Sequence, residues 1–268
     1  MVNASATLSV QIAEARGRIA ELLLEIDDIN LQINPHIVAD YATKIGYLEN
    51  DLLKWQISAR RARRRYQLAQ AKANAGLGFE ANEFEAQLDR ELADWDNLLT
   101  KSIESFLQTV ENQANTRPMS PVDEAEFRRL HKQLIKRLHP DLHPGQSGEA
   151  ARFFMVAQAA YERGDLNMLR AVDVATQGMG SEPDLANLSG DEASVELELV
   201  LAHERVTASQ LEDLKNSNPY ALKEKLEDGE WVIQRTSELK QQIQEQKDAA
   251  QAYDQKFNQL NKEASHDR

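Results

Sequence analysis

Apolar side chains recur at alternating intervals of three and four residues over most of this chain. This spacing places them on one face of an α-helix, at the period that favours coiled-coil packing between long helices. The first such seam ends at residues 30–35, where Asn34 can cap a new helix and Pro35 fits its first position. We therefore expect a tight corner there. The first seam comprises Ile12, Ala15, Ile19, Leu22, Ile26, Ile29 and Ile33.

Two further seams follow this corner. The second seam stops at Gly76 and Gly78, which indicate a turn, so we expect the third to return antiparallel along it. The sequence thus predicts an N-terminal three-helix coiled coil over residues 1–114. The second seam comprises Tyr41, Ile45, Leu48, Leu52, Trp55, Ala59, Ala62, Tyr66 and Ala69, and the third comprises Phe84, Leu88, Leu92, Trp95, Leu99, Phe106 and Val110.

Helical patterning returns after residues 177–192, a segment with glycine and proline that we interpret as a linker. A helix over residues 195–214 and a longer one after Asn218 and Pro219 predict a C-terminal helical hairpin or coiled coil within residues 193–268. The longer helix has more apolar seam than its partner can cover, so we expect the first helix or a second copy of the chain to cover the rest. A second copy would make the protein a homodimer. The long seam comprises Leu222, Leu226, Val232, Thr236, Leu239, Ile243, Ala250, Tyr253, Phe257 and Leu260.

The composition supports an all-α fold and limits the chemistry. Aromatic residues make up only 6% of the 268 residues, and residues that favour helices dominate. The formal charge of −13 disfavours nucleic acid and anionic membranes as partners. Cysteine is absent, which excludes disulfides and thiolate chemistry. Without a secretory signal pattern or a long apolar run, we expect a cytoplasmic protein.

The segment between the coils, residues 115–176, contains a local reversal of this charge. Between Phe127 and Pro140 the chain has several cations and no acidic residue. Ser120 and Pro121 are typical of a helix start, so we expect an amphipathic basic helix to follow them. Its apolar face comprises Phe127, Leu130, Leu134 and Leu138, and its cations are Arg128, Arg129, Lys132, Lys136 and Arg137.

A histidine, proline and aspartate tripeptide ends this helix. Pro140 disfavours helical geometry at His139, so we expect a loop that exposes Asp141. A second amphipathic segment then folds back and covers the leucines of the first, which gives a small helical hairpin with the tripeptide at its tip. The covering face comprises Phe153, Phe154, Val156, Ala157, Ala160 and Tyr161.

Residues 127–161, FRRLHKQLIKRLHPD followed by FFMVAQAAYE, resemble the J domain of the DnaJ family. In that family a basic helix II leads through an HPD loop into helix III, and this part docks on a DnaK-class heat-shock chaperone. The resemblance implies a co-chaperone that stimulates ATP hydrolysis by that chaperone and needs no cofactor of its own. Family members open with a helix I, for which residues 103–110 are the expected substitute. The implied trigger is His139, Pro140 and Asp141, and the implied docking face is Arg128, Arg129, Lys132, Lys136 and Arg137.

Other interpretations of individual residues stay open. The tripeptide can serve simply as a helix stop, in which proline breaks the helix and aspartate caps. His131, His139 and His143 beside Asp141 could suggest a metal site, but we expect solvated histidines and no metal. A cluster of arginines looks like a nucleic-acid patch, yet we expect it to pair with the returning helix. The cluster is Arg60, Arg61, Arg63, Arg64 and Arg65, and its expected partners are Glu91, Asp94 and Asp96.

The sequence therefore predicts long antiparallel coiled-coil helices that flank a small J-like helical hairpin. The expected function is that of a J-domain co-chaperone or adaptor, whose coiled coils bind a protein client or dimerise. The alternative is a coiled-coil scaffold whose degenerate J-like hairpin does not recruit a chaperone. Nothing points to an enzyme, because there is no glycine-rich phosphate loop and no nucleophile beside a base motif.

Overall fold

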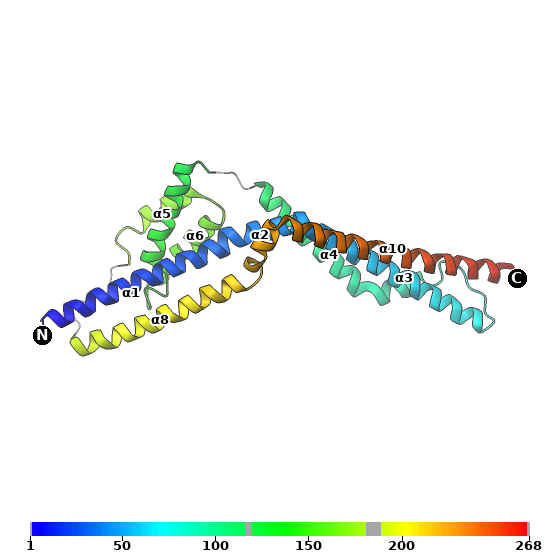
Figure 1. The fold of residues 1–268 in the computed structure, drawn as a ribbon, viewed down its shortest axis with the longest axis horizontal. Helices are drawn as coiled ribbons and strands as arrows, with labels where there is room; N and C mark the ends of the chain where they lie inside the picture. Colours follow the sequence, from blue (N-terminus) through cyan, green and yellow to red (C-terminus); the bar gives the residue numbers. More distant parts are fainter. Residues whose placement is uncertain (1, 116–118, 181–188, 267–268) are drawn as a thin grey trace. The chain divides into compact units, whose positions relative to one another are not determined.

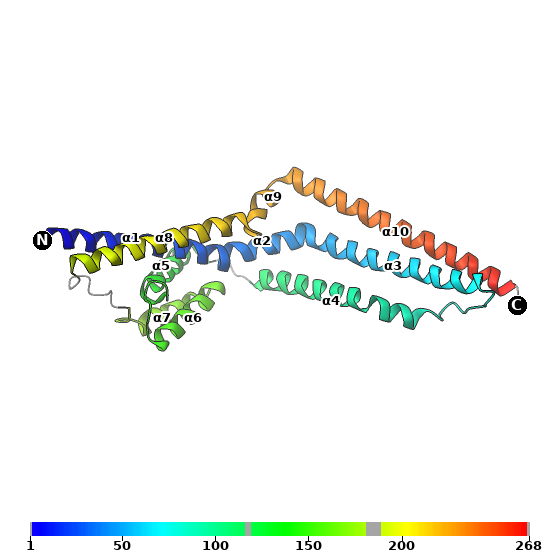
Figure 2. The same ribbon diagram turned by 90° about the horizontal axis from the view of Figure 1, so that it is seen from below.

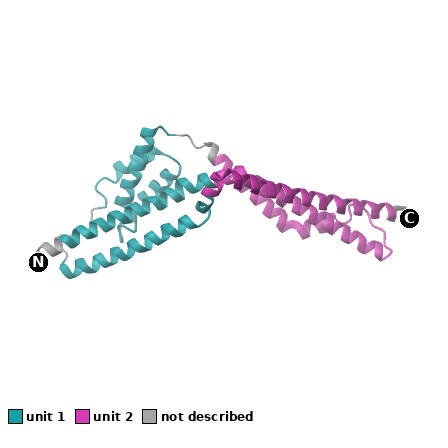
Figure 3. Ribbon diagram, viewed as in Figure 1, with its two compact units in different colours: residues 1–37, 114–223 teal, residues 38–113, 224–268 magenta. Residues whose placement is uncertain are grey.

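Every secondary-structure element that the structure describes is a helix. The computed structural model describes residues 2–115, 119–180 and 189–266, and these ranges contain no β-strand. Contacts divide the chain into two compact units, residues 1–37 with 114–223 and residues 38–113 with 224–268 (Figure 3). Each unit thus combines two separate stretches of sequence, unlike the four consecutive segments expected. The reason is that helices near the N-terminus pair with helices near the C-terminus.

The first unit contains a parallel pair of long helices, α1 (Val2–Asp28) and α8 (Gly190–Asn216) (Figure 1). Arg16 binds Glu196 with an N–O distance of 2.7 Å, and Arg18 binds Glu204 at 2.6 Å. The first apolar seam therefore packs against α8 and, as described below, against α5. It does not join the next two seams in the expected three-helix coil.

The prediction of a corner at residues 30–35 is wrong. The chain stays helical there, through a π-helical segment η1 (Ile29–Ile33) that is followed directly by α2 (Asn34–Tyr41). The N–H of Asn34 donates to the carbonyl of Ile29, five residues back. Because Pro35 has no N–H and its ring crowds the carbonyl four residues back, the wider π turn accommodates it where an ordinary helical ladder would break.

Three shorter helices complete the first unit: α5 (Pro121–Leu138), α6 (Gly148–Glu162) and α7 (Leu166–Ala175). The predicted bounds of α5 are confirmed, since Ser120 Oγ accepts a hydrogen bond from the N–H of Asp123 at 3.1 Å and His139 has extended backbone. Both α6 and α1 cover the apolar face of α5, so α1 takes the place expected for residues 103–110. The shared core includes Ile12, Ala15, Ile19, Leu23, Phe127, Leu130, Leu134, Leu138, Phe154, Ala157 and Tyr161.

The second unit is built on a second parallel pair, α3 (Tyr47–Asn74) and α10 (Gly229–His266) (Figure 2). Arg235 binds Glu49 at 3.2 Å near one end, and Arg65 binds Asp254 at 2.6 Å further along. The long C-terminal seam therefore packs on α3 of the same chain, and not on the first helix, which was one of the two expected candidates. Buried alanines on α3, Ala59 among them, let α10 approach closely.

Short elements precede each helix of this pair. A second π-helical segment, η2 (Ala42–Gly46), leads into α3. After α8 the expected break is present, as η4 (Tyr220–Leu222) and α9 (Lys223–Glu227). We expected the helices on either side of this break, α8 and α10, to form a hairpin. That prediction is wrong, because α8 packs on α1 while α10 packs on α3.

The remaining long helix, α4 (Glu85–Asn115), returns antiparallel along α3 as predicted. Gly76 forms the turn with a φ of +70°, and Asn50 accepts a hydrogen bond from Ser102 Oγ at 2.5 Å near the other end of α3. Leu88 and Leu92 of the third seam are buried, but Phe106 and Val110 on the second half of α4 are only partly buried. The third seam is therefore only partly covered.

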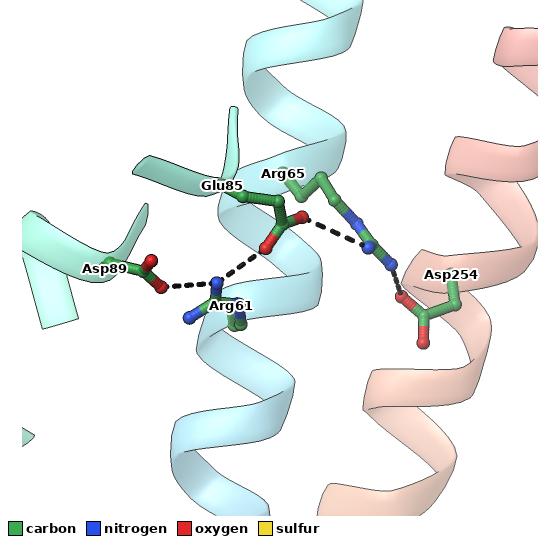
Figure 4. Close-up of polar contacts among 5 residues, drawn as sticks. All are labelled: Arg61, Arg65, Glu85, Asp89 and Asp254. Carbon is green, nitrogen blue, oxygen red and sulfur yellow. Dashed lines mark hydrogen bonds and ion pairs between the residues drawn. The ribbon is translucent and has the colours of Figure 1, made fainter. Parts of the chain in front are cut away.

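Arginines of α3 bind acidic residues of α4 and α10 (Figure 4). The prediction of internal pairing is confirmed for Glu91, which Arg64 binds at 2.7 Å. Hydrogen bonds from Arg64 and, to a smaller extent, Gln87 lower the pKa of Glu91 to about 2. Other partners differ from those expected, because the turn after α3 brings the first residues of α4 alongside. Arg61 binds Glu85 and Asp89, and Arg65 binds Glu85 and Asp254.

Candidate functional site

The loop after α5 projects the aspartate of the tripeptide outward. Pro140 ends the helix, and the carbonyl of His139 accepts hydrogen bonds from the N–H groups of Leu142 and His143 at 3.0 and 3.1 Å. The loop therefore turns tightly on its own backbone. The Asp141 side chain is 49% exposed, so the expected exposure of this carboxylate is confirmed.

His139 holds the inner side of this loop. Its ring lies edge-on to Phe154 of α6 with 4.8 Å between ring centroids, and its Nδ1 accepts a hydrogen bond from the N–H of Asp141 at 3.1 Å. Burial lowers the pKa of His139 from its ordinary value, against the smaller opposing effect of the Asp141 carboxylate. This shift favours the neutral imidazole, whose Nδ1 is the acceptor that orients the loop.

The same loop meets α8. His203 Nε2 lies 3.7 Å from Asp141 Oδ2, and His143 Nε2 lies 2.7 Å from the carbonyl oxygen of Lys136. The Asp141 carboxylate thus has a weak electrostatic contact with His203 of its own chain. At 3.7 Å and with both side chains partly exposed, this contact leaves the carboxylate able to exchange partners.

Three of the cations on α5 pair with acidic residues of the same unit. Arg128 lies 3.2 Å from Glu124, one turn earlier on α5. Lys132 and Lys136 lie 2.6 and 3.8 Å from Glu21 of α1. All of these side chains are partly exposed, so each pair contributes at most about 1 kcal/mol and can open readily.

The other two cations have different surroundings. Arg137 donates to the Asp173 carboxylate at 2.9 Å and to Thr176 Oγ1 at 2.8 Å, which fixes the end of α5 to α7. Arg129 donates only to the amide oxygen of Gln133, at 3.0 Å, and within the described residues no carboxylate lies in ion-pair range of it. Arg129 is therefore the cation on this face with its charge least compensated.

Sequence reasoning missed a buried polar cluster between α1, α5 and α6. His131 is fully buried rather than solvated, because α1 covers it, and its ring stacks on Tyr161 with 3.6 Å between centroids. Its Nε2 lies 3.3 Å from Asp27 Oδ2, while the Tyr161 hydroxyl donates to Asp28. Burial, more than this bond, raises the pKa of Tyr161. The signal in the sequence was the pair of aspartates at the end of the first seam.

The described residues also bear on two other kinds of site, a metal centre and a membrane-spanning helix. Within the ranges that the structure describes, no three histidine or acidic side chains gather closely enough to hold a metal ion, and no helix is long and apolar enough to cross a lipid bilayer. The exposed groups are the Asp141 carboxylate and the cations before it. Comparisons with known proteins gave no matching family model, no matching curated protein and no matching solved structure.

Proposed function

We propose that this protein is a J-domain co-chaperone or adaptor of the cytoplasm, which uses α5, α6 and the loop between them to recruit a DnaK-class chaperone. The single observation that carries the proposal is the position of the tripeptide. A basic helix ends at His139 and Pro140, and the following tight turn leaves Asp141 exposed between two helices that pack on each other.

Each part of this arrangement has a physical role in docking. The Asp141 carboxylate forms a charge-assisted hydrogen bond with an arginine of the chaperone, and the turn holds it in place beforehand. The cations of α5 draw the hairpin toward an acidic surface. Arg129 contributes most because it forms no ion pair within the described residues, while Lys132 and Lys136 exchange Glu21 for the partner. The long helix pairs bind a protein client or a second copy.

Steady-state ATP hydrolysis by a DnaK-class chaperone from the same organism tests this proposal. We expect the wild-type protein to stimulate hydrolysis and Asp141→Asn to abolish the stimulation, because an amide replaces the charge without changing the side-chain shape. Glu162→Gln is the matched control, since it removes one charge from the exposed end of α6. Thermal unfolding of all three proteins establishes that each is folded. Equal stimulation by wild type and Asp141→Asn would contradict the proposal.

The second candidate is a coiled-coil scaffold whose J-like hairpin packs only on its own helices. The contacts of Asp141 with His203 and of Lys132 with Glu21 favour it, because they use part of the proposed docking face within the chain. This candidate predicts that wild type, Asp141→Asn and Glu162→Gln all leave ATP hydrolysis unchanged.

A further inference from the structure

One face of α8 is apolar and has no partner among the described residues of the first unit. The opposite face is buried, with Val200 and Leu211 packed toward the rest of the unit. On the outer face Val195 is 59% exposed, Leu199 61% and Val206 54%. Ala202 lies between them and is exposed as well. Exposed apolar side chains that gather on one helix face are typical of an interaction surface.

The spacing of these four residues indicates what kind of surface it is. They follow one another at intervals of four, three and four, which is the repeat that packs knobs into holes between two helices. In heptad terms Leu199 and Val206 are a positions, while Val195 and Ala202 are d positions. The stripe therefore fits another helix that has the same repeat.

We propose that the occupant is α8 of a second copy of this chain, packed antiparallel about a two-fold axis. An antiparallel coil places a positions opposite d positions. The stripe then forms four layers, in which Val195 faces Val206 of the second copy and Leu199 faces Ala202 of the second copy, each twice by symmetry. A short helix pairing of this kind self-associates weakly and depends on concentration.

The charges beside the stripe select this orientation. The register that pairs Leu199 with Ala202 also brings Glu198 opposite Arg205 of the second copy, twice. Both residues are exposed, and neither forms an ion pair within the described part of the chain. The next pair outward, Asp191 with Glu212 of the second copy, is of like charge and lies beyond the outermost apolar layer. The coil is thereby limited to these four layers.

A parallel, in-register coil fits less well. It would place Asp191 opposite Glu196 of the second copy, which is a like-charge contact, and would leave Arg205 facing the uncharged Gln210. The Glu198–Arg205 attraction would be lost in that arrangement. The antiparallel register is therefore the one that the flanking charges support.

Sedimentation equilibrium of the full chain tests the surface independently of any chaperone. We expect wild type to dimerise with rising concentration, and Glu198→Arg or Arg205→Glu to weaken dimerisation about tenfold, because each reversal creates two like-charge pairs. The double variant restores dimerisation, since it exchanges the two charges. Leu199→Lys abolishes dimerisation, whereas Val174→Lys, at a 68% exposed position on α7, is the control that leaves it unchanged.

Cysteine crosslinking tests the orientation, because the chain has no cysteine of its own. In an antiparallel coil Val195→Cys and Val206→Cys crosslink under oxidation when the two variants are mixed, but neither crosslinks efficiently alone. A parallel coil gives crosslinks in each variant alone and overturns the proposed register. A wild-type monomer at all concentrations, or a dimer that Leu199→Lys leaves intact, overturns the surface itself.

Discussion

Gly180 lies where the chain has left α7 and passes the end of α5. Its φ is +68°, and a Cβ built there would stand 2.1 Å from the carbonyl oxygen of Arg137. Gly178, two residues earlier, has a φ of +88° but open space around it. In the sequence both are simply glycines of an expected linker. Only the position of the end of α5 distinguishes them, and spacing along the chain does not reveal that position.

Alanine substitutions separate the two effects. We expect Gly178→Ala to lower the free energy of unfolding by about 1 kcal/mol, the cost of a side chain at positive φ. Gly180→Ala has the same backbone cost and also a clash with a carbonyl, so its loss exceeds that of Gly178→Ala by about 1 kcal/mol or more. Urea denaturation measures both. Equal losses would show that the approach to Arg137 is not fixed in solution.

At the scale of elements, the bounds of α5 were readable from the sequence, but the partners of the long helices were not. Ser120 and Pro121 start α5, and Pro140 ends it, because capping and the missing proline N–H act locally. A seam, by contrast, shows which face of a helix is buried and not what buries it. The seams of α3 and α10 have the same repeat as every other long helix, so the sequence alone could not pair them.

The pairing of α3 with α10 predicts a strong effect of one aromatic side chain. Phe257 is 2% exposed, lies 5.9 Å from the Phe79 ring and has the Arg65 guanidinium over its face at 4.6 Å. We expect Phe257→Ala to lower the free energy of unfolding by about 3–5 kcal/mol in urea denaturation. Ile233→Ala, on the same helix but 70% exposed, should change it by less than about 0.5 kcal/mol. Similar losses in both variants would mean that α3 does not cover this seam.

At the scale of the whole molecule, the sequence predicted an all-α chain but not its division into units. Asn34 and Pro35 are typical of a helix start. A helix start there predicts a corner, and a corner would let the helices on either side of it pack on each other. The π turn at η1 keeps the chain helical there instead. The candidate docking loop was predictable because it depends on adjacent residues, whereas the covering of α5 by α1 depends on residues more than a hundred positions apart.

Because the two units have separate cores, a substitution that destabilises one core should leave the stability of the other unit unchanged. In the Phe257→Ala variant we expect backbone amide exchange to quicken within residues 38–113 and 224–263, because the substitution weakens only the core of the second unit. Protection in α1 and α8 should stay as in wild type. Hydrogen exchange followed by mass spectrometry measures this by segment. Equal acceleration in both units would mean that they open as one.

The parallel helix pairs also determine when the protein can fold during its synthesis. Arg16 and its partner Glu196 are 180 residues apart, and Arg65 and its partner Asp254 are 189 residues apart. At a translation rate of about 5–20 residues per second, the C-terminal partner helix is synthesised about 10–40 s after the N-terminal seam that it covers. Such distant contacts also form slowly. A nascent or prematurely terminated chain therefore presents the bare apolar faces of α1 and α3 to the ribosome exit and to every protein nearby.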